Sequence, residues 1–180
     1  MVTKKDRQGG NEARRQEVPE NRDPRLRAVW QAIESVTDPE IPVLSVIDMG
    51  IIADVRITDR KVTVDVTPTF VGCPAVDMIR ENIRQTLATI GERDVDVNVV
   101  FDPPWTSDRM TEQGRRKLKE IGFSPPTKGL VQLGMAAHQV PCPHCNSANT
   151  DMESMFGPTL CRAIYYCRDC QQSFEHFKNV

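Results

Sequence analysis

Apolar residues recur at helical spacing near the start of the chain, directly after two residues that suit the beginning of a helix. Asp23 can cap free backbone N–H groups, and Pro24 fits the first helical turn. The apolar positions that follow form one helix face and are Leu26, Val29, Trp30, Ile33 and Val36. Pro39 and Pro42 disfavour helix in the residue before each of them. We therefore expect one amphipathic helix, ended by the segment that begins at Asp38.

Strand-like patterns appear next. Two segments rich in β-branched residues, 51–57 and 62–66, are separated by four polar residues, which predicts a β-hairpin. A further strand is expected over 95–101, where Val95, Val97 and Val99 alternate with other residues. A helical segment separates this strand from the hairpin, and a strand–helix–strand connection of this length predicts parallel pairing.

The helix between these strands is expected from Pro74 to about Ile90. Its predicted buried stripe consists of Met78, Ile79, Ile83, Leu87 and Ile90, and Gly91 ends it. A last helix is expected from Ser107 to Ile121. It carries the basic run 115–117, which we interpret as a solvent-exposed face.

The expected order α-β-β-α-β-α defines an α+β domain with a small mixed sheet over residues 23–122. Residues 1–22 are polar, charged and without periodicity, so we expect a disordered tail. Residues 123–137 begin with a proline-containing polar stretch that is typical of a linker. A cysteine-rich module occupies residues 138–180.

Composition excludes several classes of function. The chain has 180 residues and a net charge of −2 with interspersed signs, unlike the basic surface of a nucleic-acid binder. No apolar run approaches the roughly 18 residues of a membrane-spanning helix. The charged N-terminus lacks the apolar core of a signal peptide. We therefore expect a cytoplasmic protein, in which cysteines serve metal or thiol chemistry before disulfides.

Two C-x2-C pairs carry the clearest chemistry of the chain. Cys142 and Cys145 form one pair, Cys167 and Cys170 form the other, and 21 residues lie between the pairs. Four thiolates complete the tetrahedral shell that zinc prefers, and the intervening segment has the length of a hairpin. We predict a structural zinc site. Iron in a rubredoxin-like site is the alternative, since tetrahedral sulfur suits both metals.

Three residues near these pairs offer further ligand atoms. Cys161 lies between the pairs and is either an alternative ligand or a buried small hydrophobic residue, which we favour. His144 and His176 each carry ring nitrogens, but four thiolates already fill the shell. We therefore expect both histidines on the surface.

Cys73 is separate from the module and stands where a strand gives way to a helix. We expect it at the N-cap position, with Pro74 as the first helical residue. There the helix dipole favours the thiolate and lowers the thiol pKa, which suits nucleophilic attack or metal ligation. An inert cysteine packed at a helix start explains the same pattern equally well.

Acidic residues precede the first strand. Asp38, Glu40 and Asp48 either cap turns beside proline or support a metal next to Cys73. None of the three histidines is near Cys73 in sequence, so a Cys/His pair would require the cysteine-rich module to fold back on the first domain. The chain also lacks a phosphate-binding glycine loop and a nucleophile elbow. We therefore do not expect an enzyme.

The same segments carry a family resemblance. Residues 38–50, 67–69 and 72–74 resemble the SufT-type iron–sulfur assembly domain. The C-terminal residues 156–159, 165–170 and 174–178 extend the resemblance to the PaaD family, accessory proteins of the bacterial multicomponent phenylacetyl-CoA epoxidase. The match covers about Trp30 to Lys178, with both domains present in the same order.

The resemblance implies a functional cysteine, matched by Cys73, that holds iron or an iron–sulfur cluster transiently. It implies a role in maturing or delivering such centres rather than in turning over phenylacetyl-CoA. The expected partners are the oxygenase and reductase components of the epoxidase, and a homo-oligomer is compatible with the sequence. A stable subunit and a transient maturation factor both fit. The competing hypothesis is an electron carrier with iron at the four-cysteine site.

Overall fold

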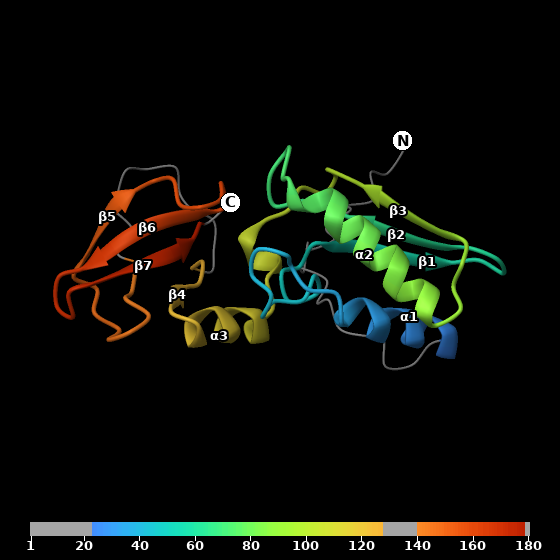
Figure 1. Cartoon of the computed structure of the whole chain (residues 1–180), viewed down its shortest axis with the longest axis horizontal. Helices are drawn as coiled ribbons and strands as arrows, with labels where there is room; N and C mark the ends of the chain where they lie inside the picture. The colour runs from blue at the N-terminus through green and yellow to red at the C-terminus, as the bar shows by residue number, and fades with distance from the viewer. Residues whose placement is uncertain (1–22, 128–139, 179–180) are drawn as a thin grey trace, which may run out of the picture.

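The computed structural model describes residues 23–127 and 140–178. The predicted disordered tail, residues 1–22, and most of the predicted linker lie outside the described residues. Within them, two units lie side by side along the long axis of the molecule (Figure 1). No helix in this part of the chain combines the length and the apolar character that crossing a membrane requires.

The first unit contains five main elements in the predicted order. They are α1 (Pro24–Glu34), β1 (Ile52–Ile57), β2 (Val62–Val66), α2 (Ala75–Thr89) and β3 (Val95–Val99). The sheet order is β1-β2-β3, with β1 antiparallel and β3 parallel to β2. Both α1 and α2 pack on this sheet and on each other (Figure 1). The predicted hairpin, the parallel pairing and the α+β class are confirmed.

The start of α1 follows from its sequence. The Asp23 side chain accepts a hydrogen bond from the Arg25 backbone N–H at 2.9 Å, and Pro24 occupies the first turn, as expected. The Arg25 guanidinium then pairs with Glu92 at 2.7 Å, which ties α1 to the segment after α2. Val29 and Ile33 are fully buried beneath the helix.

Helix α2 buries a narrower stripe than the apolar pattern predicts. Ile79, Ile83 and Leu87 are buried at four-residue spacing, as expected. Met78 and Ile90 are 55% and 44% exposed, so their predicted burial is wrong. Met78 lies about 100° around the helix from Ile79, and Ile90 follows the last helical residue.

The predicted helix 107–121 is divided. A 3-10 turn (Ser107–Arg109) precedes α3 (Glu112–Glu120). Thr111 restarts the helix, because its side chain accepts a hydrogen bond from the Gly114 N–H at 2.9 Å.

The predicted exposure of the basic run 115–117 is wrong for Arg115, whereas Arg116 is exposed and Lys117 is partly exposed. Arg115 is 7% exposed and donates hydrogen bonds to the carbonyl oxygens of Ser107 and Pro126. Lys117 Nζ lies 2.6 Å from Asp48 Oδ2. These side chains hold the end of the first unit against its interior, which their sequence pattern does not indicate.

The second unit is a four-stranded sheet. Its strands are β5 (Thr150–Ser154), β6 (Arg162–Cys167), β7 (Gln172–Phe177) and β4 (Phe123–Ser124), in the order β4-β7-β6-β5. Strands β5 and β6 form the predicted hairpin between the cysteine pairs. Residues 123 and 124, assigned to the linker from sequence, form β4 and pair in parallel with β7.

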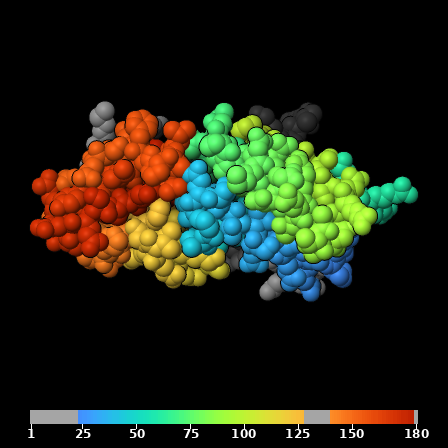
Figure 2. All heavy atoms as spheres, in the orientation of Figure 1, coloured from blue at the N-terminus to red at the C-terminus, as the bar shows by residue number. Residues whose placement is uncertain are grey.

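The two units share a packed interface. Phe177 is fully buried in the core of the first unit, and its ring lies 6.1 Å from that of Trp105. Arg162 crosses the interface to Glu40 at 3.2 Å and also pairs with Glu175 at 2.9 Å. In the space-filling view the orange and red second unit lies directly against the cyan and green parts of the first (Figure 2).

His176 is buried in this second unit, so its predicted surface position is wrong. Its Nδ1 donates to the Ser124 carbonyl at 3.1 Å, and burial lowers the pKa of the imidazole from 6.5 to about 4. The unfolded chain therefore binds a proton that the folded chain excludes between these values. The stabilisation that comes from neutral, buried His176 is fully present above pH 6.5, and it is lost as the pH falls toward 4.

We expect the protonation of His176 to lower the free energy of unfolding by about 2–3 kcal/mol at acidic pH. The His176→Asn variant keeps a donor near the Nδ1 position without titrating, so its urea-unfolding free energy should change less between neutral pH and about pH 5. Both proteins are compared with zinc in excess. An equal loss of stability in the two proteins would contradict this assignment.

Candidate metal centre and thiol pocket

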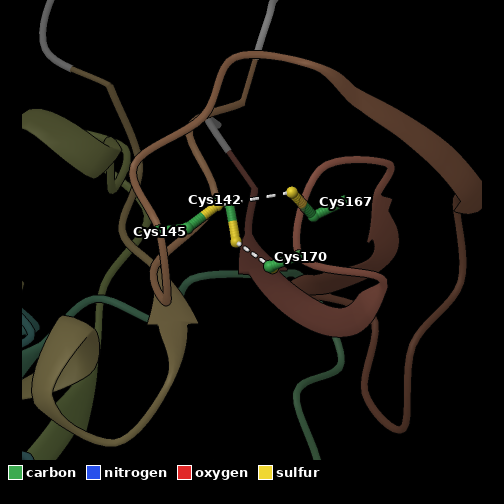
Figure 3. Close-up of side chains that lie close together, drawn as sticks. All are labelled: Cys142, Cys145, Cys167 and Cys170. Atoms are coloured by element: carbon green, nitrogen blue, oxygen red, sulfur yellow. Dashed lines mark hydrogen bonds between the residues drawn. The ribbon is translucent and has the colours of Figure 1, made fainter.

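Four sulfur atoms converge at one end of the second unit. The Sγ atoms of Cys142, Cys145, Cys167 and Cys170 all lie within 4.8 Å of one another (Figure 3). The Cys142–Cys170 and Cys145–Cys167 sulfur pairs are each 3.6 Å apart. Sulfurs at about 2.3 Å from a tetrahedral zinc ion are separated by about 3.8 Å. The donor set therefore fits one metal ion.

Each C-x2-C pair lies on a tight turn. The Cys142 carbonyl accepts from the Asn146 N–H, and the Cys167 carbonyl accepts from the Gln171 N–H, both at 2.9 Å. Asn146 and Gln171 close the turns with φ of 60° and 58°. Hydrogen bonding from the Cys170 N–H lowers the pKa of Cys167 to about 7, which favours the thiolate that a metal requires.

The surroundings of the sulfurs agree with a structural role. Cys142 and Cys167 are fully buried in a small core with Val140 and Phe174, against which Tyr165 packs. The rings of Tyr165 and Phe174 stack at 5.9 Å. Among the described residues, the sulfur group contains no histidine. His144 is exposed, and the His176 ring is hydrogen-bonded to the Ser124 carbonyl.

Cys161 is not part of the four-sulfur group. It packs against the core of the first unit and lines a cavity of about 270 Å³ between the two units. The Thr159 hydroxyl lies 3.1 Å from its sulfur. The cavity carries six side chains of chemical interest: Asp38, Glu40, Cys73, Phe156, Cys161 and Arg162.

Cys73 reaches this cavity from the first unit. It lies one residue before the N-cap of α2, which is Pro74, so it stands one position earlier than expected. Gly72 precedes it with φ of 81°, a left-handed conformation that favours glycine. The cysteine is half-buried, and residues of the second unit line the same cavity.

The expected low pKa of Cys73 is wrong. Burial raises the pKa of this thiol above its ordinary value, and the Ala75 N–H at the helix start only partly offsets that effect. The neighbouring Cys161, Asp38 and Glu40 raise the pKa further, because negative groups disfavour a second negative charge. The dipole of α2 is therefore outweighed by burial, and one of the negative neighbours, Cys161, comes from the second unit.

We therefore expect slow alkylation of Cys73 at neutral pH. Iodoacetamide reacts with thiolates, so the pH–rate profile of the native, zinc-loaded protein should show its inflection above about 8.5, the ordinary cysteine value. The rate is assigned to Cys73 by mass spectrometry and compared with Cys73→Ala. An inflection below the ordinary value would show that the helix start dominates after all.

The acidic residues separate into two groups. Asp38 Oδ1 accepts from the backbone N–H groups of Glu40 and Ile41, both at 2.8 Å, and both Asp38 and Glu40 line the cavity. Asp48 does not line it. Asp48 instead pairs with Lys117 at 2.6 Å and accepts from Thr111 at 3.0 Å, so it serves the packing of α3.

The cavity contains no histidine among the described residues that line it. The second unit does fold back on the first, as a Cys/His pair would require, but it brings Phe177 and not His176 to the cavity. Sequence reasoning also missed Arg162, which is buried at this interface. Its only signal in the sequence is its position next to Cys161.

Comparisons with known proteins agree with this division. Residues 126–178 match the family described as "PaaD zinc beta ribbon domain", and residues 26–99 match "Iron-sulfur cluster assembly protein". A protein of Escherichia coli (strain K12), named as one component of a "Putative 1,2-phenylacetyl-CoA epoxidase", is 37% identical over 157 residues. The alignment covers 87% of this chain and 94% of that protein.

Two shorter relatives match only part of the chain. The "Fe-S protein maturation auxiliary factor" of Porphyromonas gingivalis is 39% identical, over 53% of this chain and 89% of its own length. The "Fe-S protein maturation auxiliary factor SufT" of Staphylococcus aureus is 38% identical, over 44% of this chain and 92% of its own length. The chain therefore belongs to the same family as the Escherichia coli protein, the PaaD family, and joins an iron–sulfur cluster assembly domain to a PaaD zinc ribbon.

Proposed function

We propose that this protein is an accessory factor that matures or delivers iron or iron–sulfur centres for the multicomponent phenylacetyl-CoA epoxidase. One observation carries the proposal. In the unit that matches the iron–sulfur assembly family, Cys73 shares a cavity with the carboxyl groups of Asp38 and Glu40. Sulfur and carboxylate donors together are compatible with iron, and two relatives are named as Fe-S protein maturation auxiliary factors.

The proposed role does not include turnover of phenylacetyl-CoA by this chain. A nucleophilic cysteine needs a neighbouring base or a lowered pKa, whereas Cys73 has a raised pKa and faces carboxyl groups. Such a thiol is better suited to hold a metal, because a bound cation favours its deprotonation.

The mouth of the cavity supports a protein client. Phe156 and Leu160 line the cavity and are 67% and 53% exposed, and Val71, two residues before Cys73, is 82% exposed. Apolar side chains gathered around a pocket are typical of a protein-binding surface. We propose that the oxygenase and reductase components of the epoxidase dock here.

The ribbon metal has a structural role in this proposal. Two of its four ligands are buried in the ribbon core, and zinc in such a closed site undergoes no redox change. The competing electron carrier would hold iron in the same four sulfurs. Metal analysis and visible absorption of anaerobically purified protein separate the two, because zinc sites are colourless and ferric sulfur sites are not.

The test is to produce the oxygenase and reductase components with and without this chain and to assay iron and sulfide in each. We expect lower metal content in at least one component when the chain is absent, together with a lower epoxidation rate. Equal metal content and equal epoxidation rates would overturn the proposal.

A further inference from the structure

Strands β6 and β7 connect the four-sulfur group to the interface between the two units. Strand β6 begins at Arg162 and ends at Cys167, and β7 begins at Gln172, two residues after Cys170, and ends at Phe177. In Figure 1 the arrow of β6 points away from the first unit, and the arrow of β7 points back toward it. This hairpin therefore has a metal end, at the turn, and an interface end.

The pairing between the two strands is continuous. Arg162 pairs with Phe177 at the interface end, Cys167 pairs with Gln172 at the metal end, and all six positions of each strand share one register. At roughly 3.4 Å per residue the two ends are about 17 Å apart. Because side chains alternate between the faces of a strand, a slip of one residue would turn every side chain to the opposite face.

A metal ion held by the four sulfurs fixes the register at the metal end. Cys167 and Cys170 flank the turn of the hairpin, and both sulfurs must reach the same ion as those of Cys142 and Cys145. The register of a hairpin is set by the geometry of its turn. Metal binding and local folding are coupled in sites of this kind, so the order of both strands depends on the metal.

The interface end forms one wall of the cavity that contains Cys73. Phe177 is fully buried in the core of the first unit, and Arg162 pairs with Glu40 at 3.2 Å. The loop 156–161, which leads into β6, lines the cavity together with Arg162 and Phe177. The Gly157 N–H donates to the Arg162 carbonyl at 2.9 Å. The loop is thus attached to the hairpin, and its position depends on where the interface end lies.

We propose that zinc in the ribbon holds this wall in place, so that zinc occupancy controls how accessible Cys73 is. The inference deepens the proposed function, on which it rests for the role of the thiol, because it concerns the regulation of the same cavity. Strand β4 also holds β7, at two positions. The sheet order separates β4 from β6, so β4 does not fix the strand that carries the loop. Loss of zinc therefore releases the wall while the first unit stays folded.

The experiment compares alkylation of Cys73 in the full-length protein before and after zinc removal by a chelator. A brief pulse of iodoacetamide is applied at one pH, and mass spectrometry assigns the label to the peptide that contains Cys73. We expect zinc removal to speed labelling of Cys73 at least about tenfold, because a thiol in a locally opened segment is more accessible. Adding zinc back before the pulse should restore the slow rate.

The Phe177→Ala variant loosens the interface end and keeps all four zinc ligands. With zinc bound, it should label Cys73 about as fast as the zinc-free parent protein does. Zinc removal should then add less than about twofold, because two changes that act through one contact are not additive. Zinc content is measured to show that the ribbon is folded. Phe101→Ala, which removes an exposed phenyl ring, is the matched control and should respond to zinc removal as the parent does.

Hydrogen exchange of the parent protein gives a second measurement that needs no variant. The Trp105 ring lies 6.1 Å from that of Phe177, so residues 105–110 should lose protection when zinc is removed. Strand β2 lies in the centre of the first sheet and should keep its protection. This contrast distinguishes release of the wall from unfolding of the whole chain.

The proposal is overturned if Cys73 labels at the same rate with and without zinc, or if zinc removal has the same effect in Phe177→Ala as in the parent. It is also overturned if β2 loses protection together with residues 105–110, because zinc would then stabilise the whole chain. If Phe177→Ala does not fold, the two parent measurements decide the outcome. All of these results come from the purified protein, so they are independent of the client metal content that tests the proposed function.

Discussion

Replacing Cys170 with Ser is expected to release the ribbon metal and unfold the ribbon. The apparent free energy of zinc binding to a four-ligand structural site is about 10–16 kcal/mol, and it is also folding free energy. A serine hydroxyl is a poor substitute for the thiolate, and the remaining three sulfurs cannot complete the shell. Zinc analysis and near-ultraviolet circular dichroism of the purified variant measure the two effects.

The matched control for this prediction is Cys161→Ser, because Cys161 lies outside the four-sulfur group. It should retain one zinc ion per chain. The first unit of Cys170→Ser should keep its helices but lose stability, since Phe177 packs in its core. Full zinc occupancy in Cys170→Ser would disprove the four-sulfur assignment.

The second large effect is expected from Cys73→Ala. The epoxidase components made with this variant should contain about as little iron or cluster as components made without the chain. The physical reason is that alanine removes the sulfur donor that the first unit contributes to the cavity. Iron and sulfide assays of each component, together with the epoxidation rate, are the measurements.

A structural effect of Cys73→Ala is separated by its stability. Losing a half-buried thiol should cost only about 1 kcal/mol, and the variant should keep its zinc because the ribbon ligands are elsewhere. Met78→Ala, on the exposed side of α2, is the control and should support the clients as the parent does. If Cys73→Ala supports full client iron and rate, Cys73 is not the working residue.

Local patterns account for most of the secondary structure. The cap at Asp23, the β-branched segments of β1 and β2, and the spacing of Ile79, Ile83 and Leu87 each depend on residues near one another in sequence. The four sulfurs converge for a similarly local reason, because each C-x2-C turn places two of them and the hairpin between the turns brings the two pairs together. Periodicity and spacing are sufficient for features of this kind.

The cavity between the two units is lined by residues of both units, so its lining depends on how the units pack together. Nothing near Cys161 in the sequence indicates that it lines the same cavity as Cys73, because 87 residues separate the two. The burial of His176, and the pairing of Lys117 with Asp48, likewise arise from contacts between distant segments. Burial is the main cause of the raised pKa at Cys73, and Cys161 of the second unit adds to it, which the position before α2 does not indicate.

Strand β4 has a consequence for any study of the ribbon by itself. Phe123 and Ser124 shield one side of β7, whose other side pairs with β6. A fragment starting at residue 138 would leave that side as an open sheet edge, and open edges recruit strands from other copies and promote aggregation. Metal affinities measured on such a fragment would then mix ligand binding with self-association. A fragment that begins before Phe123 keeps its own edge strand.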